Sequence, residues 1–243
     1  MSALIPTSIP PLKSPSFDGS STTSGDSLPV SAELLSEAGM ARALKRMVDI
    51  AGACTALLFL TPLMLLIGVL IRLDSGGPIL FRQARRGHRG RIFQVLKFRT
   101  MVVDAEKRLK DLENSNESAG GVLFKLKKDP RVTPLGAFLR RYSLDELPQF
   151  INVLRGEMSL VGPRPLQLRD SELLASVNPM AYERRLEVMP GITGPWQVGG
   201  RSELDHERMV DLDLDYVQNW SMGRDLAILC KTFLVVLLRR GAY

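Results

Sequence analysis

The segment KRMVDIAGACTALLFLTPLMLLIGVLIRLD, residues Lys45–Asp74, decides the architecture of this chain. No charged side chain occurs in it from Ile50 to Ile71, which is about the length of helix that spans a bilayer. A core helix of a globular protein normally keeps a polar face, and this segment has none. The sequence therefore predicts that the segment contacts a membrane.

Two features predict how this apolar segment meets the membrane. Arginine and lysine residues flank it on both sides, and basic flanks prefer the cytoplasmic face. Pro62 lies near its middle and can break a helix, because proline lacks an N–H and clashes with the preceding turn. Together these features favour a bent, re-entrant helix that enters and leaves on one face, with a straight span as the alternative.

The composition excludes several classes of protein. The net charge of the 243-residue chain is +6, but only 6% of its residues are aromatic, which is poor material for stacking nucleic-acid bases. We therefore expect no nucleic-acid partner, and the positive charge suits anionic lipid headgroups or phosphorylated substrates. Two cysteines and two histidines cannot build a disulfide framework and make a zinc site improbable, so any metal should be held by oxygen.

The rest of the chain predicts a mainly helical α+β unit. Residues 1–40 are rich in Ser, Pro, Thr and Gly and are expected to form a disordered tail. The membrane helix is placed at 41–73 and a further domain at 74–243, which begins with a small β-hairpin around RRGHRG and ends in an apolar helix lying against the membrane or the core. PGITGPWQVGGRS, residues 190–202, is predicted to be loop.

The stretch SLDELPQFINVLRGEMSLVGPRP, residues Ser143–Pro165, holds the candidate chemistry and has two readings. In the first, Ser143 and Glu146 form a capping box that starts a helix. In the second, Pro148 opens the helix, because a proline is tolerated only in the first turn. Asp145 and Glu146 would then lie on the preceding segment, and the two carboxylates would need another role.

Adjacent carboxylates suit phosphoryl chemistry better than glycoside hydrolysis. An Asp can attack phosphorus and a neighbouring Glu can hold Mg²⁺, whereas the two carboxylates of a glycosidase face each other across a sugar. Arg164, stiffened by prolines on both sides, suits a phosphate, although an ordinary surface arginine in a turn is equally compatible. Lys97 and Arg99 share one face of a predicted strand and form either a basic patch or two solvated side chains.

Four motifs, in order, resemble the bacterial sugar transferase family. They are KFRTM, LDELPQFINVLRGEMSLVGPRP, PGITGPWQVGGR and the DLDYV run, and the resemblance covers the chain from about Ala43 to its end. These proteins are monotopic phosphoglycosyl transferases that start exopolysaccharide and related glycans. The resemblance implies that Asp145 attacks a UDP-sugar bound with Mg²⁺, that Glu146 ligates the Mg²⁺, and that polyprenyl (undecaprenyl) phosphate then accepts the sugar phosphate.

The same resemblance implies the surroundings of the enzyme. We expect it at the bacterial inner membrane, with its catalytic domain (74–243) on the cytoplasmic face, in contact with membrane lipids and compatible with a homodimer. Hydrolysis of a phosphorylated membrane substrate and a non-catalytic membrane adaptor are the alternatives. Residues implied to contact the substrate are Lys97, Arg99, Arg140, Arg164, Asp213 and Asp225.

Two departures from the family limit what the resemblance implies. Many members read ITGWAQ where this chain reads ITGPWQ, and the difference falls at Gly194–Gln197. Because this loop is expected near the sugar or the nucleotide, the resemblance does not predict which sugar is transferred. Thr61 stands where the family more often has Ser before the proline of the re-entrant helix, a milder change.

Overall fold

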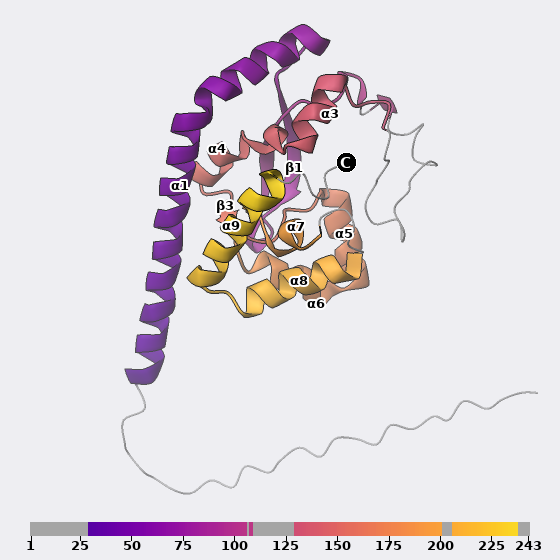
Figure 1. Cartoon of the computed structure of the whole chain (residues 1–243). Helices are drawn as coiled ribbons and strands as arrows, with labels where there is room; N and C mark the ends of the chain where they lie inside the picture. The colour runs from indigo at the N-terminus through magenta and orange to yellow at the C-terminus, as the bar shows by residue number, and fades with distance from the viewer. Residues whose placement is uncertain (1–28, 106, 109–128, 201–205, 238–243) are drawn as a thin grey trace, which may run out of the picture. The chain divides into compact units, whose positions relative to one another are not determined.

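The computed structural model describes residues 29–105, 107–108, 129–200 and 206–237, and the unit Met40–Tyr243 holds the features discussed below. The described chain is mainly helical with two small sheets, so the predicted α+β class is confirmed (Figure 1). The elements are α1 (Pro29–Ser75), β1 (Leu80–Arg86), η1 (His88–Gly90), β2 (Ile92–Phe98), α3 (Pro134–Arg141), η3 (Leu144–Glu146), α4 (Gln149–Leu154), β3 (Ser159–Val161), α5 (Leu168–Val177), α6 (Pro179–Leu186), β4 (Gly191–Thr193), α7 (Pro195–Gly199), α8 (His206–Gln218) and α9 (Met222–Leu237).

Helix α1 contains the predicted membrane segment. Over Gly39–Ser75 it is long and apolar enough to cross a membrane, and only 17% of its most apolar window is buried. It includes Pro62, the residue type that most often kinks helices, and Figure 1 shows α1 bending toward its C-terminal end. The helix begins at Pro29, so the boundary predicted at residue 40 falls inside it. Of the tail predicted for residues 1–40, residues 1–28 lie outside the described residues.

Both halves of α1 pack on the same domain. Before Pro62, Ala53 is fully buried in a cluster with Val153 and Leu160. After Pro62, Ile71 is buried in a second cluster with Leu139 of α3. The two ends of the apolar segment therefore contact one globular unit.

Polar contacts fasten the first half of α1 to the interior. The Asp49 carboxylate accepts hydrogen bonds from the Ser159 hydroxyl and the Leu160 N–H, both at 2.9 Å. Arg46 donates to the carbonyl oxygens of Val153 and Leu154 at 2.7 and 3.1 Å, which caps the C-terminal end of α4. The buried Asp49 and the partly buried Arg46 thus have partners on β3 and α4, so α1 is held against both elements.

The predicted hairpin is confirmed. Strands β1 and β2 pair antiparallel across the RRGHRG turn, with Arg85 opposite Phe93 and Phe81 opposite Lys97. The turn needs left-handed backbone, which Arg89 (φ 55°) and Gly90 (φ 73°) supply. In this register, Arg85 and Lys97 lie on the same face of the hairpin.

A second sheet corrects the prediction of a loop over residues 190–202. Strand β4 pairs parallel with β3, and α7 follows it within the same stretch. The pairing depends on glycine, because a Cβ on Gly191 would lie 2.1 Å from the Gly162 backbone nitrogen. The glycines in this stretch led to the prediction of a loop, but in the structure they allow two backbones to approach closely.

Of the remaining helices, α9 packs on the second sheet, and α5 to α8 pack on one another and on α9. The predicted helical break at Pro179 is confirmed, since α5 ends at Val177 and α6 begins at Pro179. Helices α6 and α8 pack through Ala181 and Val210. Helix α9 exposes Leu226, Phe233 and Leu234.

Candidate active site

The capping box predicted as one reading of Ser143 and Glu146 is wrong. Ser143 adopts left-handed backbone (φ 56°), and its side chain caps no N–H. Asp145 and Glu146 lie in the single 3₁₀ turn η3, and α4 begins only after Pro148. The second reading is correct: proline opens the helix, and the two carboxylates stand before it.

Glu146 forms ion pairs with two cations from distant parts of the chain. Its Oε1 atom lies 2.7 Å from the Lys97 Nζ of β2 and 2.6 Å from the Arg164 Nη2. Its Oε2 atom has a longer contact of 3.4 Å with Arg164 Nη1. Lys97 also lies 3.9 Å from the Asp145 Oδ2, so one ammonium group serves both carboxylates.

Asp145 differs from its neighbour because its carboxylate is weakly held. It is 8% exposed, and among the described residues it forms one ion pair, with Lys97, and accepts no hydrogen bond. Its pKa is raised by burial and by the adjacent Glu146, which together outweigh Lys97, Arg140 and Arg164. Burial also works against the charged form of Glu146, but Arg164 and Lys97 hold its pKa well below its usual range. The pair therefore has one firmly ionised carboxylate and one held less tightly.

Arg140 adds a further cation near Asp145. It projects from the last turn of α3, and its Nε donates to the Thr100 hydroxyl at 2.9 Å. Burial lowers the pKa of its guanidinium, partly offset by the negative charge of Asp145. Arg140, Lys97 and Arg164 therefore place their positive charge around the acidic pair.

Arg99 does not join this group. The shared basic patch predicted for Lys97 and Arg99 is not formed, because Arg99 donates to the Ser75 hydroxyl and to the Gly76 carbonyl at the end of α1. Its guanidinium thus stabilises the C-terminal end of that helix, where free carbonyls and the helix dipole favour a cation.

Arg85 belongs to the site, although the sequence reading did not single it out. Its Nη1 donates to the Pro165 carbonyl at 2.7 Å, and both burial and the nearby Arg164 charge lower its pKa to about 10. Pairing the hairpin strands in register would have revealed it, because Arg85 shares the face of Lys97. Trp196 is a second residue of the site that was missed, and its ring centroid lies 6.0 Å from the Arg164 guanidinium carbon.

Asp213 and Asp225 lie away from the acidic pair. Asp213 is fully buried on α8, where its Oδ2 lies 3.0 Å from the Arg185 Nη2. Asp225 accepts hydrogen bonds from Lys45, Tyr216 and Trp220 at 2.5, 2.7 and 3.2 Å. Neither aspartate has a contact with Asp145 or Glu146 in the described structure.

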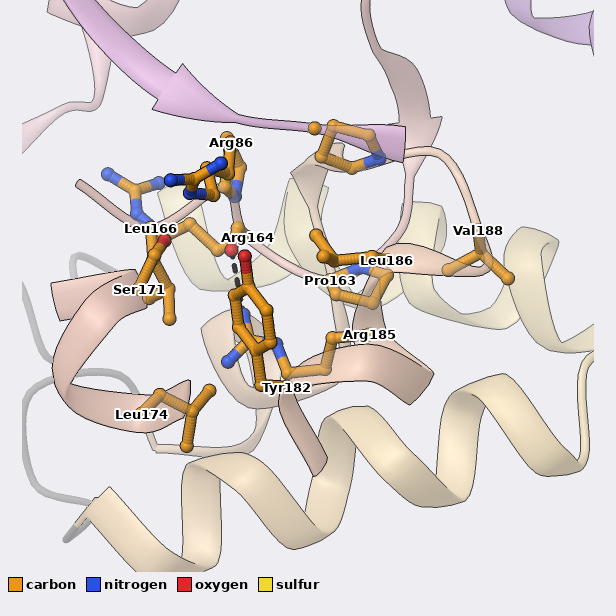
Figure 2. A pocket seen from close by; sticks show the side chains of 13 residues that line it. Arg86, Pro163, Arg164, Leu166, Ser171, Leu174, Tyr182, Arg185, Leu186 and Val188 are labelled. Carbon is orange, nitrogen blue, oxygen red and sulfur yellow. Dashed lines mark hydrogen bonds between the residues drawn. The ribbon is translucent and has the colours of Figure 1, made fainter. Parts of the chain in front are cut away.

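A small pocket adjoins the Arg164 loop (Figure 2). Its empty space is about 330 Å³ and is partly open to solvent, and Tyr182 of α6 stands within it. Arg86 and Arg164 approach it from above in this view and Arg185 from below, so its charged lining residues are all basic.

The donor set fits a magnesium ion only in part. Within the described residues, no three His, Cys, Asp or Glu side chains gather as a metal cage. One Glu146 oxygen is fully engaged by cations, whereas the other has a single long contact. Such a site fits an ion that takes one or two protein carboxylate ligands and completes its shell with phosphate and water oxygens.

The fold and site combine one helix that is long and apolar enough to cross a membrane with an acidic pair set among cations. A model of the family described as bacterial sugar transferase matches residues 40–239, so the chain belongs to the bacterial sugar transferase family. This confirms the resemblance of the four motifs and identifies the protein as a transferase enzyme.

Named relatives agree with this assignment. The chain is 45% identical over 202 residues to the exopolysaccharide production protein ExoY of Sinorhizobium fredii, a match that covers 82% of this chain and 88% of ExoY. It is 44% identical over 205 residues both to the UDP-galactose-lipid carrier transferase of Erwinia amylovora and to the undecaprenyl-phosphate galactose phosphotransferase of Salmonella typhimurium. Those two matches cover 83% of this chain but only 42% of each relative, so the chain spans less than half of their length.

Proposed function

We propose that this protein transfers a sugar 1-phosphate from a UDP-sugar to polyprenyl phosphate through a covalent intermediate on Asp145. An Asp145 oxygen attacks the phosphorus that carries the sugar, the P–O–P bridge breaks, and UMP leaves. A polyprenyl phosphate oxygen then attacks the same phosphorus and breaks its bond to Asp145. The products are polyprenyl diphosphate sugar and the free carboxylate.

The observation that carries this proposal is the contrast within the acidic pair. The Glu146 carboxylate is fixed by Lys97 and Arg164, whereas Asp145 is buried beside them without a hydrogen bond from the described residues. A nucleophile needs a free lone pair, and Asp145 has one. Names of relatives that mention a UDP-galactose donor and an undecaprenyl-phosphate acceptor support the same substrate classes.

The cations around the pair suit two phosphates. Arg164, Arg140 and Arg85 carry planar guanidinium groups, which bind phosphate oxygens in a bidentate manner, and Lys97 adds a point charge. Their positive charge would stabilise negative charge that develops on the transferred phosphoryl group and on UMP. Glu146 would hold Mg²⁺ together with the donor phosphates, and the ion would supply further charge neutralisation there.

The packing of α1 supports a re-entrant attachment, and we place it on the cytoplasmic face of the inner membrane as part of this proposal. A straight span would carry one end of the helix across about 30 Å of hydrocarbon. Here Ala53 and Ile71, on opposite sides of Pro62, both pack on the same domain. The exposed apolar side chains between them, such as Leu58 and Phe59, would enter one leaflet from the side of the catalytic domain.

This attachment places the reaction at the lipid surface, where a polyprenyl phosphate presents its headgroup. A hydrolase would use the same carboxylates but pass the phosphosugar to water. The family assignment favours the transferase over the hydrolase and over a non-catalytic adaptor.

UMP release tests the proposal. Protein purified in detergent with Mg²⁺ is given a panel of UDP-sugars, with and without undecaprenyl phosphate. We expect repeated turnover only with the lipid, and one preferred sugar. Release beyond one equivalent without lipid would indicate the hydrolase, and no release with any UDP-sugar would overturn the assigned donor.

A further inference from the structure

The loop that presents Arg164 is held by its carbonyl groups. Pro163 and Pro165 have no N–H to donate, so the backbone on either side of Arg164 relies mainly on its carbonyl acceptors. Each of three consecutive carbonyls accepts a hydrogen bond from a different element. Pro163 accepts from the Gly191 N–H of β4 at 3.0 Å, Arg164 from Arg185 of α6 at 2.8 Å, and Pro165 from Arg85 of β1 at 2.7 Å.

Arg185, which contacts the Arg164 carbonyl, also contacts the buried Asp213. Arg185, only 8% exposed at its side chain, donates to the Arg164 carbonyl and forms its ion pair with Asp213 of α8 (Figure 2 shows the first contact). The Asp213 side chain is fully buried, and its oxygens have no well-aligned hydrogen bond from the described residues. Burying a carboxylate in this way is costly, and burial accordingly raises its pKa to about 6. Apolar packing would stabilise the fold at lower cost, which indicates another reason for the acid.

We propose that Asp213 and Arg185 are positioning residues that aim the Arg164 side chain at the acidic pair. Asp213 orients the guanidinium of Arg185, and Arg185 fixes the Arg164 carbonyl through a hydrogen bond. Because the flanking prolines restrict the backbone, fixing this carbonyl also fixes the direction of the Arg164 side chain. The far end of that side chain reaches Glu146 at 2.6 Å. The inference rests on the proposed function only in one respect: we expect the direction of the Arg164 side chain to affect donor binding and turnover.

A double-mutant cycle tests the inference through activity. Asp213→Asn keeps the size of the side chain and removes its charge, and we expect it to lower kcat/KM for UMP release by about 10- to 100-fold. In an Arg164→Lys background the same substitution should cost less than about twofold, because its effect passes through the Arg164 guanidinium. Arg184→Ala, which removes an exposed arginine next to Arg185, is the matched control and should leave kcat/KM unchanged. An equal loss in both backgrounds, or no loss in either, would overturn the inference.

Trp196 gives a second readout that needs no activity. Its ring lies 6.0 Å from the Arg164 guanidinium carbon, and Trp220 is the only other tryptophan of the chain. In a Trp220→Phe background, Arg164→Lys and Arg185→Lys should change the Trp196 emission in the same direction, whereas Arg184→Ala should not. Arg185→Lys keeps a positive charge but on a shorter side chain without a guanidinium, so its nitrogen should no longer reach both the Arg164 carbonyl and Asp213 as the Arg185 Nη2 does. This variant therefore also serves if Asp213→Asn does not fold.

Far-UV circular dichroism and thermal unfolding verify that each variant is folded. If the wild type releases no UMP, the proposed function fails while the Trp196 emission still decides the inference. Emission unchanged in a folded Arg185→Lys variant would show that Arg185 does not position Arg164.

Discussion

Asp145 and Asp225 are both buried aspartates with a lysine nearby, yet their carboxylates are held differently. Asp225 is 4% exposed and accepts three hydrogen bonds, including one from Lys45 at 2.5 Å. Asp145 is 8% exposed, and its lysine, Lys97, lies 3.9 Å away. Both oxygens of Asp225 are engaged and hold elements together, whereas Asp145, set among cations, keeps an oxygen that can react. Burial alone does not separate these two roles.

The largest effect should follow from removing the reactive carboxylate. We expect Asp145→Asn to lower UMP release by at least about 10³-fold, because an amide cannot form the phosphorus–oxygen bond. Membrane association and the unfolding temperature should stay near those of the wild type. Asp211→Asn, an exposed position on α8, is the matched control. Turnover like that of the wild type in Asp145→Asn would remove Asp145 from the mechanism.

Glu146→Gln should reduce both activity and stability. We expect a loss of roughly 10²-fold in kcat, because the ionic partner of Lys97 and Arg164 disappears. The free energy of unfolding should fall by about 2 kcal/mol, less than for a fully buried pair because these side chains are partly exposed. Chemical denaturation at pH 7 measures the second effect, and an unchanged midpoint would contradict the ion-pair role.

The pH dependence of stability tests whether ion pairs with Arg164 and Lys97 lower the pKa of Glu146. The folded-state pKa of this group is held below its ordinary value of 4.5 by Arg164 and Lys97. Its contribution is therefore present above about pH 4.5 and is lost as the pH falls below that value. The difference in unfolding free energy between the wild type and Glu146→Gln should shrink as the pH is lowered from 6 to 3, and a constant difference would argue against this cause.

Asp225→Asn should lower stability much more than turnover. We expect it to destabilise the fold by about 3 kcal/mol, because the Lys45 ammonium loses its buried partner. Turnover per folded molecule should fall less than tenfold, since no contact joins Asp225 to the acidic pair in the described structure. Thermal unfolding and UMP release below the transition measure the two effects. A loss of activity as large as that of Asp145→Asn would instead place Asp225 in the chemistry.

The smallest predicted effect is a shift in a pH profile. Burial and Glu146 raise the pKa of Asp145, and Lys97 is the strongest group that opposes this. Lys97→Met should therefore move the acid limb of kcat/KM to higher pH, because a larger fraction of Asp145 is then protonated. Arg82→Met, an exposed position on the same hairpin, should leave the limb in place. A shift to lower pH would contradict the assigned electrostatics.

Local patterns in the sequence predicted the elements well. The apolar run, the turn RRGHRG and the break at Pro179 each act over a few residues, so α1, the hairpin and the end of α5 could be predicted. The pairing of β3 with β4 could not, because it depends on Gly162 and Gly191 meeting across the fold.

The site was predicted only where neighbouring residues define it. Asp145 and Glu146 stand side by side in the chain, and the proline rule placed them before α4. The partners of other acids are remote: Lys45 lies 180 residues before Asp225, so no spacing rule could show that this acid fastens α1. Arg99 was misplaced for the same reason, since its partners lie on the preceding helix.

Trapping the covalent intermediate would show whether Asp145 is the nucleophile. Purified protein is incubated with the preferred UDP-sugar and Mg²⁺ without acceptor lipid, and its mass is measured intact and after proteolysis. We predict up to one equivalent of sugar phosphate on the peptide that contains Asp145, matched by UMP release, and discharge of this adduct on addition of undecaprenyl phosphate. An adduct on another residue, or UMP release that needs the lipid from the first turnover and leaves no adduct, would contradict Asp145 as the nucleophile.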